Sequence, residues 1–207
     1  GSAQITYYNT SPDTLDRLVF RLYQNINKPD AMRDFPIKPV DENNSFILNS
    51  LSVGKKNYNT ASDTSLEFTG TNLIIKNLSI NPGKQSVINI GWEIKVPKEN
   101  GIRMGQYDST VFFIAYWYPQ AAVYDDIDGW DMTEYTGNAE FYNDFNNYDI
   151  KISLPNNYCV WATGELENPE ELFDPQILAR YKEANVSLKT VNIISAKDYT
   201  DKIPLLK

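Results

Sequence analysis

The chain has 207 residues, of which 42% are hydrophobic and 13% aromatic, enough to build a buried core in one large domain or two small ones. Its formal net charge is -8, and lysine and arginine are interspersed among the acids, so no basic stripe is present to neutralise nucleic-acid phosphates. The chain has no histidine and one cysteine, Cys159, which excludes imidazole bases, histidine zinc sites and Ser-His-Asp triads within it. The longest apolar stretch, residues 111–118, is too short to cross a bilayer as a helix. We therefore expect no nucleic-acid partner, no membrane insertion, and no catalytic or metal-ligating residue in this chain.

The first part of the chain predicts strands joined by polar turns. Residues 4–9 alternate apolar and polar side chains, and a turn at residues 10–13 leads into a second strand. In that strand, Leu18, Phe20 and Leu22 share the face expected to be buried. The other face, with Arg17, Val19, Arg21 and Tyr23, should point outward, which predicts a half-buried strand. The polar segment 25–44 has weak periodicity, so we expect a long loop with one short helical turn at residues 29–33.

The middle of the chain contains the strongest strand pattern. Over residues 87–96, five large apolar side chains alternate strictly with other residues and should face the core. Residues 111–117 are apolar on both faces, which predicts either a central strand covered on both sides or a strand whose second face meets a partner. Shorter strands are expected at residues 46–53, 65–69 and 73–78.

The last part of the chain predicts a hairpin, a helix and a final strand. Residues 147–154 alternate and are followed across a Pro-Asn-Asn turn by residues 158–163. Asp174 is suited to cap a helix with Pro175 at its first position, and residues 187–195 return to a strand pattern. We therefore predict a mostly β, antiparallel domain, either saddle-like or a sandwich, with one short helix.

Aromatic and acidic residues gather at residues 115–131. Pro119 follows three aromatic residues and ends the strand, so Tyr116, Trp117 and Tyr118 should lie at a sheet rim, where binding sites are commonly built. Aromatic residues at strand ends more often fill a core, and we weigh that interpretation more heavily for Trp117 and Trp130.

The acidic residues of this region have several possible roles. The run at residues 125–131 lacks the alternating ligands of an EF-hand, so a solvated acidic turn is favoured over a calcium loop. Glycoside hydrolysis needs two carboxyl groups, and no spacing in a sequence establishes such a pair. The carboxylates that would have to supply it are Asp125, Asp126, Asp128, Asp131, Glu134 and Glu140.

Several separate motifs occur in the order found in one family. The pattern W-Y-P-x-x-A-x-Y-D-x-x-x-G-W at residues 117–130 is followed by Gly137, Glu140-Phe141, the segment 144–150 and A-T-G-E-L at residues 162–166. The opening contains Y-Y-N-T-S-P-D-T-L at residues 7–15 and L-Y-Q-N at residues 22–25. Over nearly its whole length, the chain resembles the N-terminal domain of bacterial zinc aminopeptidases of the aminopeptidase N type.

This resemblance implies a saddle-shaped β domain that packs against a thermolysin-like catalytic domain further along the same polypeptide. Residues 1–207 would then be a single N-terminal domain of a longer metallopeptidase, and the leading Gly1-Ser2 is typical of a cloning scar. The zinc ion and the catalytic glutamate would belong to the missing domain, so we expect no cofactor here. Family resemblance also implies an exported bacterial protein, in the periplasm or at the cell surface.

In that family the first domain contributes a loop to the peptide cleft. A Gln or Glu of this loop binds the free amino group of the substrate. Tyr116 stands where relatives often have Gln, and the acidic position that follows falls on Tyr118 or, with a shifted register, near Gln120. A tyrosine ring can also hold a cation. The candidate substrate-binding residues are therefore Tyr118, Gln120, Tyr116 and Trp117.

Three functions follow from these observations. The favoured one is a non-catalytic domain that braces the catalytic domain and walls the peptide cleft, which predicts an exposed apolar or aromatic patch where that domain docks. The second is a free-standing module that binds glycans or peptides through surface aromatic residues, namely Trp117, Tyr118, Tyr124 and Trp130. The third is a small carboxylate-dependent glycosidase.

Overall fold

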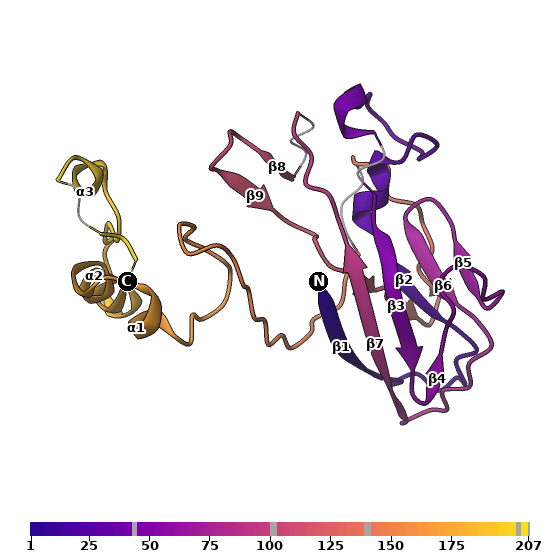
Figure 1. Ribbon diagram of the computed structural model, residues 1–207. Coiled ribbons are helices and arrows are strands. Elements are labelled where there is room, and N and C mark those ends of the chain that lie inside the picture. The colour runs from indigo at the N-terminus through magenta and orange to yellow at the C-terminus, as the bar shows by residue number, and fades with distance from the viewer. Residues whose placement is uncertain (43–44, 100–102, 139–141, 202–203, 207) are drawn as a thin grey trace. The chain divides into compact units, whose positions relative to one another are not determined.

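The computed structural model describes residues 1–207 except 43–44, 100–102, 139–141, 202–203 and 207 (Figure 1). The chain forms two compact units, Gly1–Asn146 and Asn147–Lys207. Strands account for 27% of the residues and helices for 15%. The mostly β, antiparallel fold class is confirmed.

The first unit contains an antiparallel sheet in the order β1-β7-β3-β4, whose longer strands run roughly from top to bottom in Figure 1. The long strand β7 is flanked on both sides, and the predicted alternation is confirmed as far as Trp92: Ile88, Ile90 and Trp92 are at most 3% exposed. Asn89, between them, faces solvent. The prediction was wrong for Ile94 and Val96, which lie beyond the end of β7 and are only half buried. The strands are β1 (Ser2–Tyr8), β3 (Ile47–Val53), β4 (Lys56–Asn57) and β7 (Gln85–Glu93).

A second antiparallel sheet of the same unit has the order β10-β2-β6-β5. Its apolar side chains, among them Phe20, Leu73 and Ile75, form one continuous core cluster with Ile88 and Ile90 of the first sheet. Two sheets that share a core in this way make a sandwich. The strands are β2 (Leu18–Arg21), β5 (Leu66–Phe68), β6 (Asn72–Ile75) and β10 (Gln120–Ala121).

Strand β2 is buried on both faces, so the prediction of a half-buried strand was wrong. All four of its residues are at most 4% exposed. Val19 and Arg21 were expected to face outward, but the Arg21 guanidinium donates to the carbonyl oxygen of Thr133 and to the carboxylate of Asp131. A later segment of the chain therefore covers the second face, which local alternation does not reveal.

The long loop after β2 has its helical turns in other places than expected. The 3₁₀ helices η1 (Tyr23–Asn27) and η2 (Pro39–Asp41) lie on either side of the predicted turn at residues 29–33. The Asn25 carboxamide oxygen accepts from the Phe46 backbone N–H at 3.0 Å and holds η1. The buried Asp41 carboxylate accepts from the N–H groups of Lys98 and Glu99 at 2.6 and 2.9 Å and holds η2. Tertiary hydrogen bonds thus decide where the turns form.

Two small hairpins complete the first unit. Strand β8 (Met104–Gln106) pairs with β9 (Phe112–Ile114), and β11 (Tyr124–Asp125) pairs with β12 (Gly129–Trp130). All three residues of β9 are exposed, between 41% and 54%. The expectation of a central strand covered on both sides is therefore wrong for β9, and only its alternative, a strand with a face open to a partner, agrees with this exposure.

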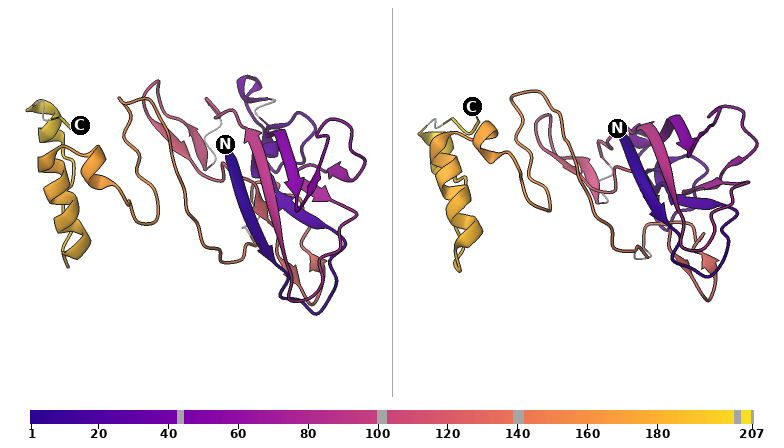
Figure 2. Two further views of the ribbon diagram at one scale, coloured as in Figure 1. Left: turned by 60° about the horizontal axis from the view of Figure 1, so that its bottom comes forward. Right: turned by 90° about the horizontal axis from the view of Figure 1, so that it is seen from below.

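The second unit is helical where it has regular structure. The predicted helix is confirmed as α2, the longest coiled ribbon in Figure 2. The Asp174 carboxylate accepts from the Gln176 N–H at 2.9 Å as its N-cap. Arg180 of α2 forms an ion pair with Asp198 of α3 at 2.8 Å. The helices are α1 (Pro169–Leu172), α2 (Pro175–Val186) and α3 (Ala196–Thr200).

The strands predicted at residues 147–154, 158–163 and 187–195 are absent, although the structure describes all these residues. The alternating side chains of the first segment, from Tyr148 to Leu154, remain 49% to 57% exposed. An extended segment becomes a strand only when a neighbouring strand takes up its backbone hydrogen bonds. Within the described parts of the chain, no helix has the length and apolar character needed to span a membrane.

Candidate functional site

The aromatic segment at residues 115–119 connects β9 to β10 and changes direction at Tyr116. Tyr116 has a φ angle of 53°, in the left-handed region that residues other than glycine rarely adopt. Holding a side chain there costs about 1–3 kcal/mol, which the surrounding contacts must offset. The predicted substrate-binding residues at this turn and after it lie in different surroundings.

Trp117 and Tyr118 pack against the core of the first unit. The Trp117 ring centroid lies 6.0 Å from that of Trp92 and 5.1 Å from that of Tyr118. The Trp92 indole N–H donates to the Trp117 carbonyl oxygen at 2.9 Å. Both residues of the segment are partly buried against the core cluster, and Trp130 is buried at 8% exposure. The interpretation of these tryptophans as packing residues agrees with this arrangement.

Gln120 begins β10 opposite Arg21 of β2 and is half buried. Strand β10 is the edge strand of its sheet, so the backbone of Gln120 is held by β2. Of the four candidate residues, Tyr116 alone lines the pocket beside the aromatic segment. The structure thus brings Trp117 and Tyr118 together and places Tyr116 and Gln120 in separate surroundings.

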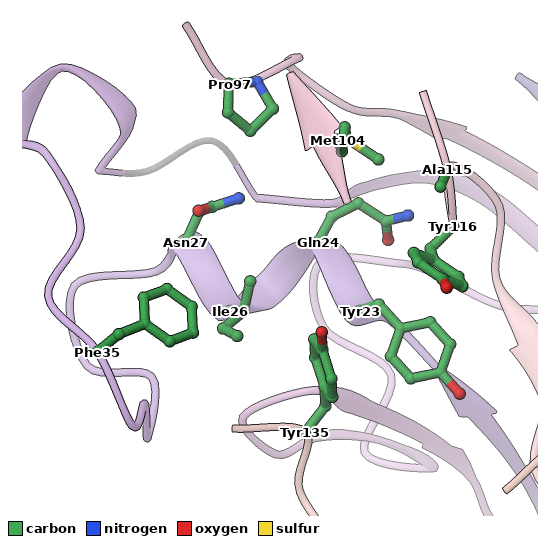
Figure 3. Close-up of a pocket in the computed structure, with 10 residues that line it drawn as sticks. All are labelled: Tyr23, Gln24, Ile26, Asn27, Phe35, Pro97, Met104, Ala115, Tyr116 and Tyr135. Atoms are coloured by element: carbon green, nitrogen blue, oxygen red, sulfur yellow. The ribbon is translucent and has the colours of Figure 1, made fainter. Parts of the chain in front are cut away.

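This pocket has a volume of about 40 Å³ and is built around η1 (Figure 3). Figure 3 shows Phe35 approaching η1 from the opposite end to Tyr116. None of the ten residues drawn around the pocket carries a charged side chain. Its main polar and aromatic lining comes from Tyr23, Gln24, Asn27, Tyr116 and Tyr135.

Three tyrosine rings meet edge to face at the pocket. The Tyr23 ring centroid lies 5.2 Å from that of Tyr135 and 5.5 Å from that of Tyr116, with interplanar angles of 83° and 68°. Such pairs favour this geometry electrostatically. Burial raises the pKa of Tyr23, and the hydrogen bond from its hydroxyl to Asn143, 2.9 Å long, partly opposes that rise. The Tyr23 hydroxyl is therefore neutral and a donor at physiological pH.

A buried polar network holds the segment that carries Tyr135. The Arg21 guanidinium donates to the Asn72 carboxamide oxygen at 2.6 Å, to the Thr133 carbonyl oxygen and to the Asp131 carboxylate. Burial raises the pKa of Asp131, but hydrogen bonds from Arg21 and Thr133 outweigh burial and hold that pKa below its ordinary value. The ionised Asp131 carboxylate therefore helps to hold residues 131–135 against β2.

Glu134 ties the same segment to the start of β6. Its carboxylate accepts from the Thr71 backbone N–H, from the Thr71 hydroxyl at 2.7 Å and from the Asn72 amide at 3.2 Å. The Tyr135 N–H donates to the Thr71 hydroxyl oxygen at 2.7 Å. Burial raises the pKa of Glu134, but hydrogen bonds from Thr69, Thr71 and the backbone lower it overall. A carboxylate bonded in this way is a structural anchor and no ready proton donor.

The acidic run forms the β11–β12 turn. The Asp125 carboxylate accepts from the N–H groups of Ile127 and Asp128 at 3.0 and 2.8 Å, and these bonds lower its pKa. Gly129 has a φ of 71° and supplies the left-handed residue that closes the turn. The interpretation as a solvated acidic turn is supported.

Two of the candidate carboxylates form hydrogen bonds within the fold. Asp131 and Glu134 are bonded within the fold as above, and Glu140 lies outside the described residues. Among the residues that the structure describes, no three His, Cys, Asp or Glu side chains gather where they would hold a metal ion.

Comparisons with known proteins identified no relative of this chain. A scan against family models, a search of curated proteins and a search of solved structures each gave no match.

Sequence reasoning missed the pocket residues Gln24 and Tyr135. Gln24 follows a strand in the motif L-Y-Q-N, which gave no sign that its side chain would be buried at 4% exposure. Tyr135 comes from a segment 111 residues later in the chain, held there by Glu134 and Thr71. An unusual buried glutamine is recognised only after the chain has folded.

Proposed function

We propose that this chain is a non-catalytic domain of an aminopeptidase-like zinc metallopeptidase, and that it braces the catalytic domain and forms one wall of the peptide-substrate cleft. The observation that carries this proposal is the exposed apolar surface on β9 and the residue before it. Val111, Phe112, Phe113 and Ile114 are 50%, 41%, 54% and 45% exposed. Contiguous apolar exposure of this kind marks a surface that another protein part covers.

The position of this surface supports the cleft role. Tyr116 follows the last residue of β9 by two positions, so a domain that docks on β9 lies next to the aromatic segment. Substrate held between the two would lie beside the segment that carries Tyr116, Trp117, Tyr118 and Gln120. The contribution of this chain is then to bind and orient the substrate, which lowers the barrier by fixing the attack geometry.

The zinc chemistry implied by the family resemblance would be supplied by residues of the catalytic domain. This chain has no histidine to ligate the metal. Its part in the reaction is confined to packing and positioning. The resemblance also leads us to place the whole protein outside the cytoplasmic membrane of a bacterium.

The glycan-binding alternative is not favoured by any observation. Tyr124 and Trp130 meet edge to face, with centroids 5.4 Å apart and planes at 72°. Trp117 and Tyr118 also meet at 72°, and all four rings are buried or packed against the core. Sugar rings stack on flat, open aromatic faces, which this arrangement does not offer.

The proposal is tested in the longer protein. The coding sequence that follows Lys207 should contain H-E-x-x-H with a glutamate beyond it. Tyr116→Ala and Gln120→Ala in that protein should lower kcat/KM on aminoacyl substrates without loss of zinc. The matched control is Tyr8→Ala, which removes an exposed tyrosine at the end of β1.

Two results would overturn the proposal. One is a downstream sequence with no metal-ligand motif. The other is an unchanged kcat/KM in both site variants, equal to that of the Tyr8→Ala control.

A further inference from the structure

The side-chain carboxamide of Gln24 is buried and forms no hydrogen bond with the described residues. It lies in η1 and is 4% exposed. Its side-chain oxygen and nitrogen are both shielded from solvent, and neither has a hydrogen-bond partner among the described residues. A carboxamide has two N–H donors and an oxygen with two lone pairs. Leaving all of them unpaired in the interior is costly, and such groups in folded proteins point to a missing partner.

The pocket beside Gln24 is where that partner fits. Gln24 lines the pocket together with the rings of Tyr116 and Tyr135 (Figure 3). The last torsion of a glutamine side chain is soft, so the amide can turn toward a guest in the cavity whose wall it forms. The volume of about 40 Å³ corresponds to roughly three water positions, or to one group of a few non-hydrogen atoms.

The lining selects a neutral guest. All ten residues around the pocket are uncharged, and a charge buried there would lose its hydration without a counter-charge. The Arg103 guanidinium, which lies 3.4 Å from the Tyr116 hydroxyl, would repel an ammonium group. The apolar surfaces of Pro97, Met104 and the tyrosine rings suit the faces of a flat group.

We infer that this pocket is a binding site for a neutral, planar amide group, such as the side-chain amide of an asparagine or glutamine in a peptide. An amide is uncharged at neutral pH and offers Gln24 both an N–H donor and a carbonyl acceptor in one plane. Two parallel hydrogen bonds then satisfy one donor and the oxygen of Gln24, and the aromatic rings cover the faces of the pair. This inference stands apart from the proposed function, because it needs no catalytic domain.

The test uses the full 207-residue chain and acetamide as the probe. Titration is followed by the NMR signals of the Gln24 side-chain amide and of the Tyr135 backbone amide. We expect saturable shifts of both signals with acetamide. Acetate, which adds a charge, and acetone, which lacks the N–H donor, should bind at least about tenfold more weakly.

Gln24→Met is the matched variant, since it keeps an unbranched side chain and removes the amide. In this variant the acetamide-induced shift of the Tyr135 backbone amide should be lost, while the circular dichroism spectrum stays that of the unsubstituted chain. Equal shifts with all three probes, shifts that persist in Gln24→Met, or no saturable shift with acetamide would each overturn the inference. In the last case the pocket holds ordered water only. Because the variant and probes act on this chain alone, failure here is distinct from failure of the metallopeptidase proposal.

Discussion

Replacing Gln24 by methionine should stabilise the ligand-free protein, against the usual effect of a core substitution. The amide of Gln24 is buried and unpaired, and an unsatisfied buried group of this kind costs about 1–3 kcal/mol. Methionine has similar length, fills irregular space and brings no polar group that needs a partner. The free energy of unfolding should therefore rise by about 1–3 kcal/mol. At about 3 °C per kcal/mol for a chain of this size, Tm should rise by about 3–9 °C.

Asn9 provides the matched control, because it is a buried amide whose bonds are made. Its amide nitrogen donates to the carbonyl oxygens of Asp13 and Ile80 at 2.7 Å each, and its oxygen accepts from the Ser11 N–H at 3.1 Å. Asn9→Leu keeps the branched shape of the side chain but leaves these three backbone groups without their hydrogen-bond partner. We expect a loss of about 2 kcal/mol or more.

The assay is urea unfolding followed by tryptophan fluorescence in a Trp161→Phe background. Three tryptophans, Trp92, Trp117 and Trp130, then remain, and all lie in the first unit. The slope of the free energy against urea should stay constant between variants, so that the midpoints report stability alone. A destabilised Gln24→Met protein would refute the reasoning, because it would show that water or a neighbour already satisfies the amide.

Three further predictions concern other parts of the chain. Glu134 has a pKa below its ordinary 4.5 in the folded protein, so its stabilisation is present above that pH and is lost as the pH falls through the folded pKa. Glu134→Gln should thus lower stability at neutral pH and flatten the decline of stability in acid, and an unchanged acid profile in urea titrations would contradict this. Asp174→Ala removes the N-cap bond of α2 and should cost about 1 kcal/mol of the stability of the second unit, seen as reduced helicity and an earlier melt by circular dichroism; equal melts would argue against the cap. Phe113→Thr on exposed β9 should change stability by less than about 0.5 kcal/mol and reduce binding of a hydrophobic dye, whereas unchanged dye binding would place the accessible apolar surface elsewhere.

Two elements with a clear local pattern, β7 and α2, were predictable from the sequence. The strict alternation around Ile88 and Ile90 located β7, and the Asp-Pro pair at Asp174 located the start of α2. In both cases the signal is local, because side-chain direction in a strand and hydrogen bonding at a helix start depend on neighbouring residues.

Apolar alternation alone did not determine which of the later segments form strands or which faces are buried. Residues 147–154 alternate as clearly as an outer strand, but their backbone has no strand beside it among the described residues. Residues 111–117 raised the opposite problem, since an apolar pattern on both faces fits a covered strand as well as an exposed one. The exposure of β9 resolved this in favour of an open face.

The candidate site shows the same division. Composition by itself determined that this chain has no histidine for catalysis or metal binding and no basic stripe for nucleic acid, because these depend on which side chains exist. The pattern around Tyr116 marked a segment of interest. Only the tertiary structure decided that Trp117 and Tyr118 pack on the core, and that Gln24 and Tyr135 share a pocket, because burial and hydrogen-bond partners are set by segments far apart in the chain.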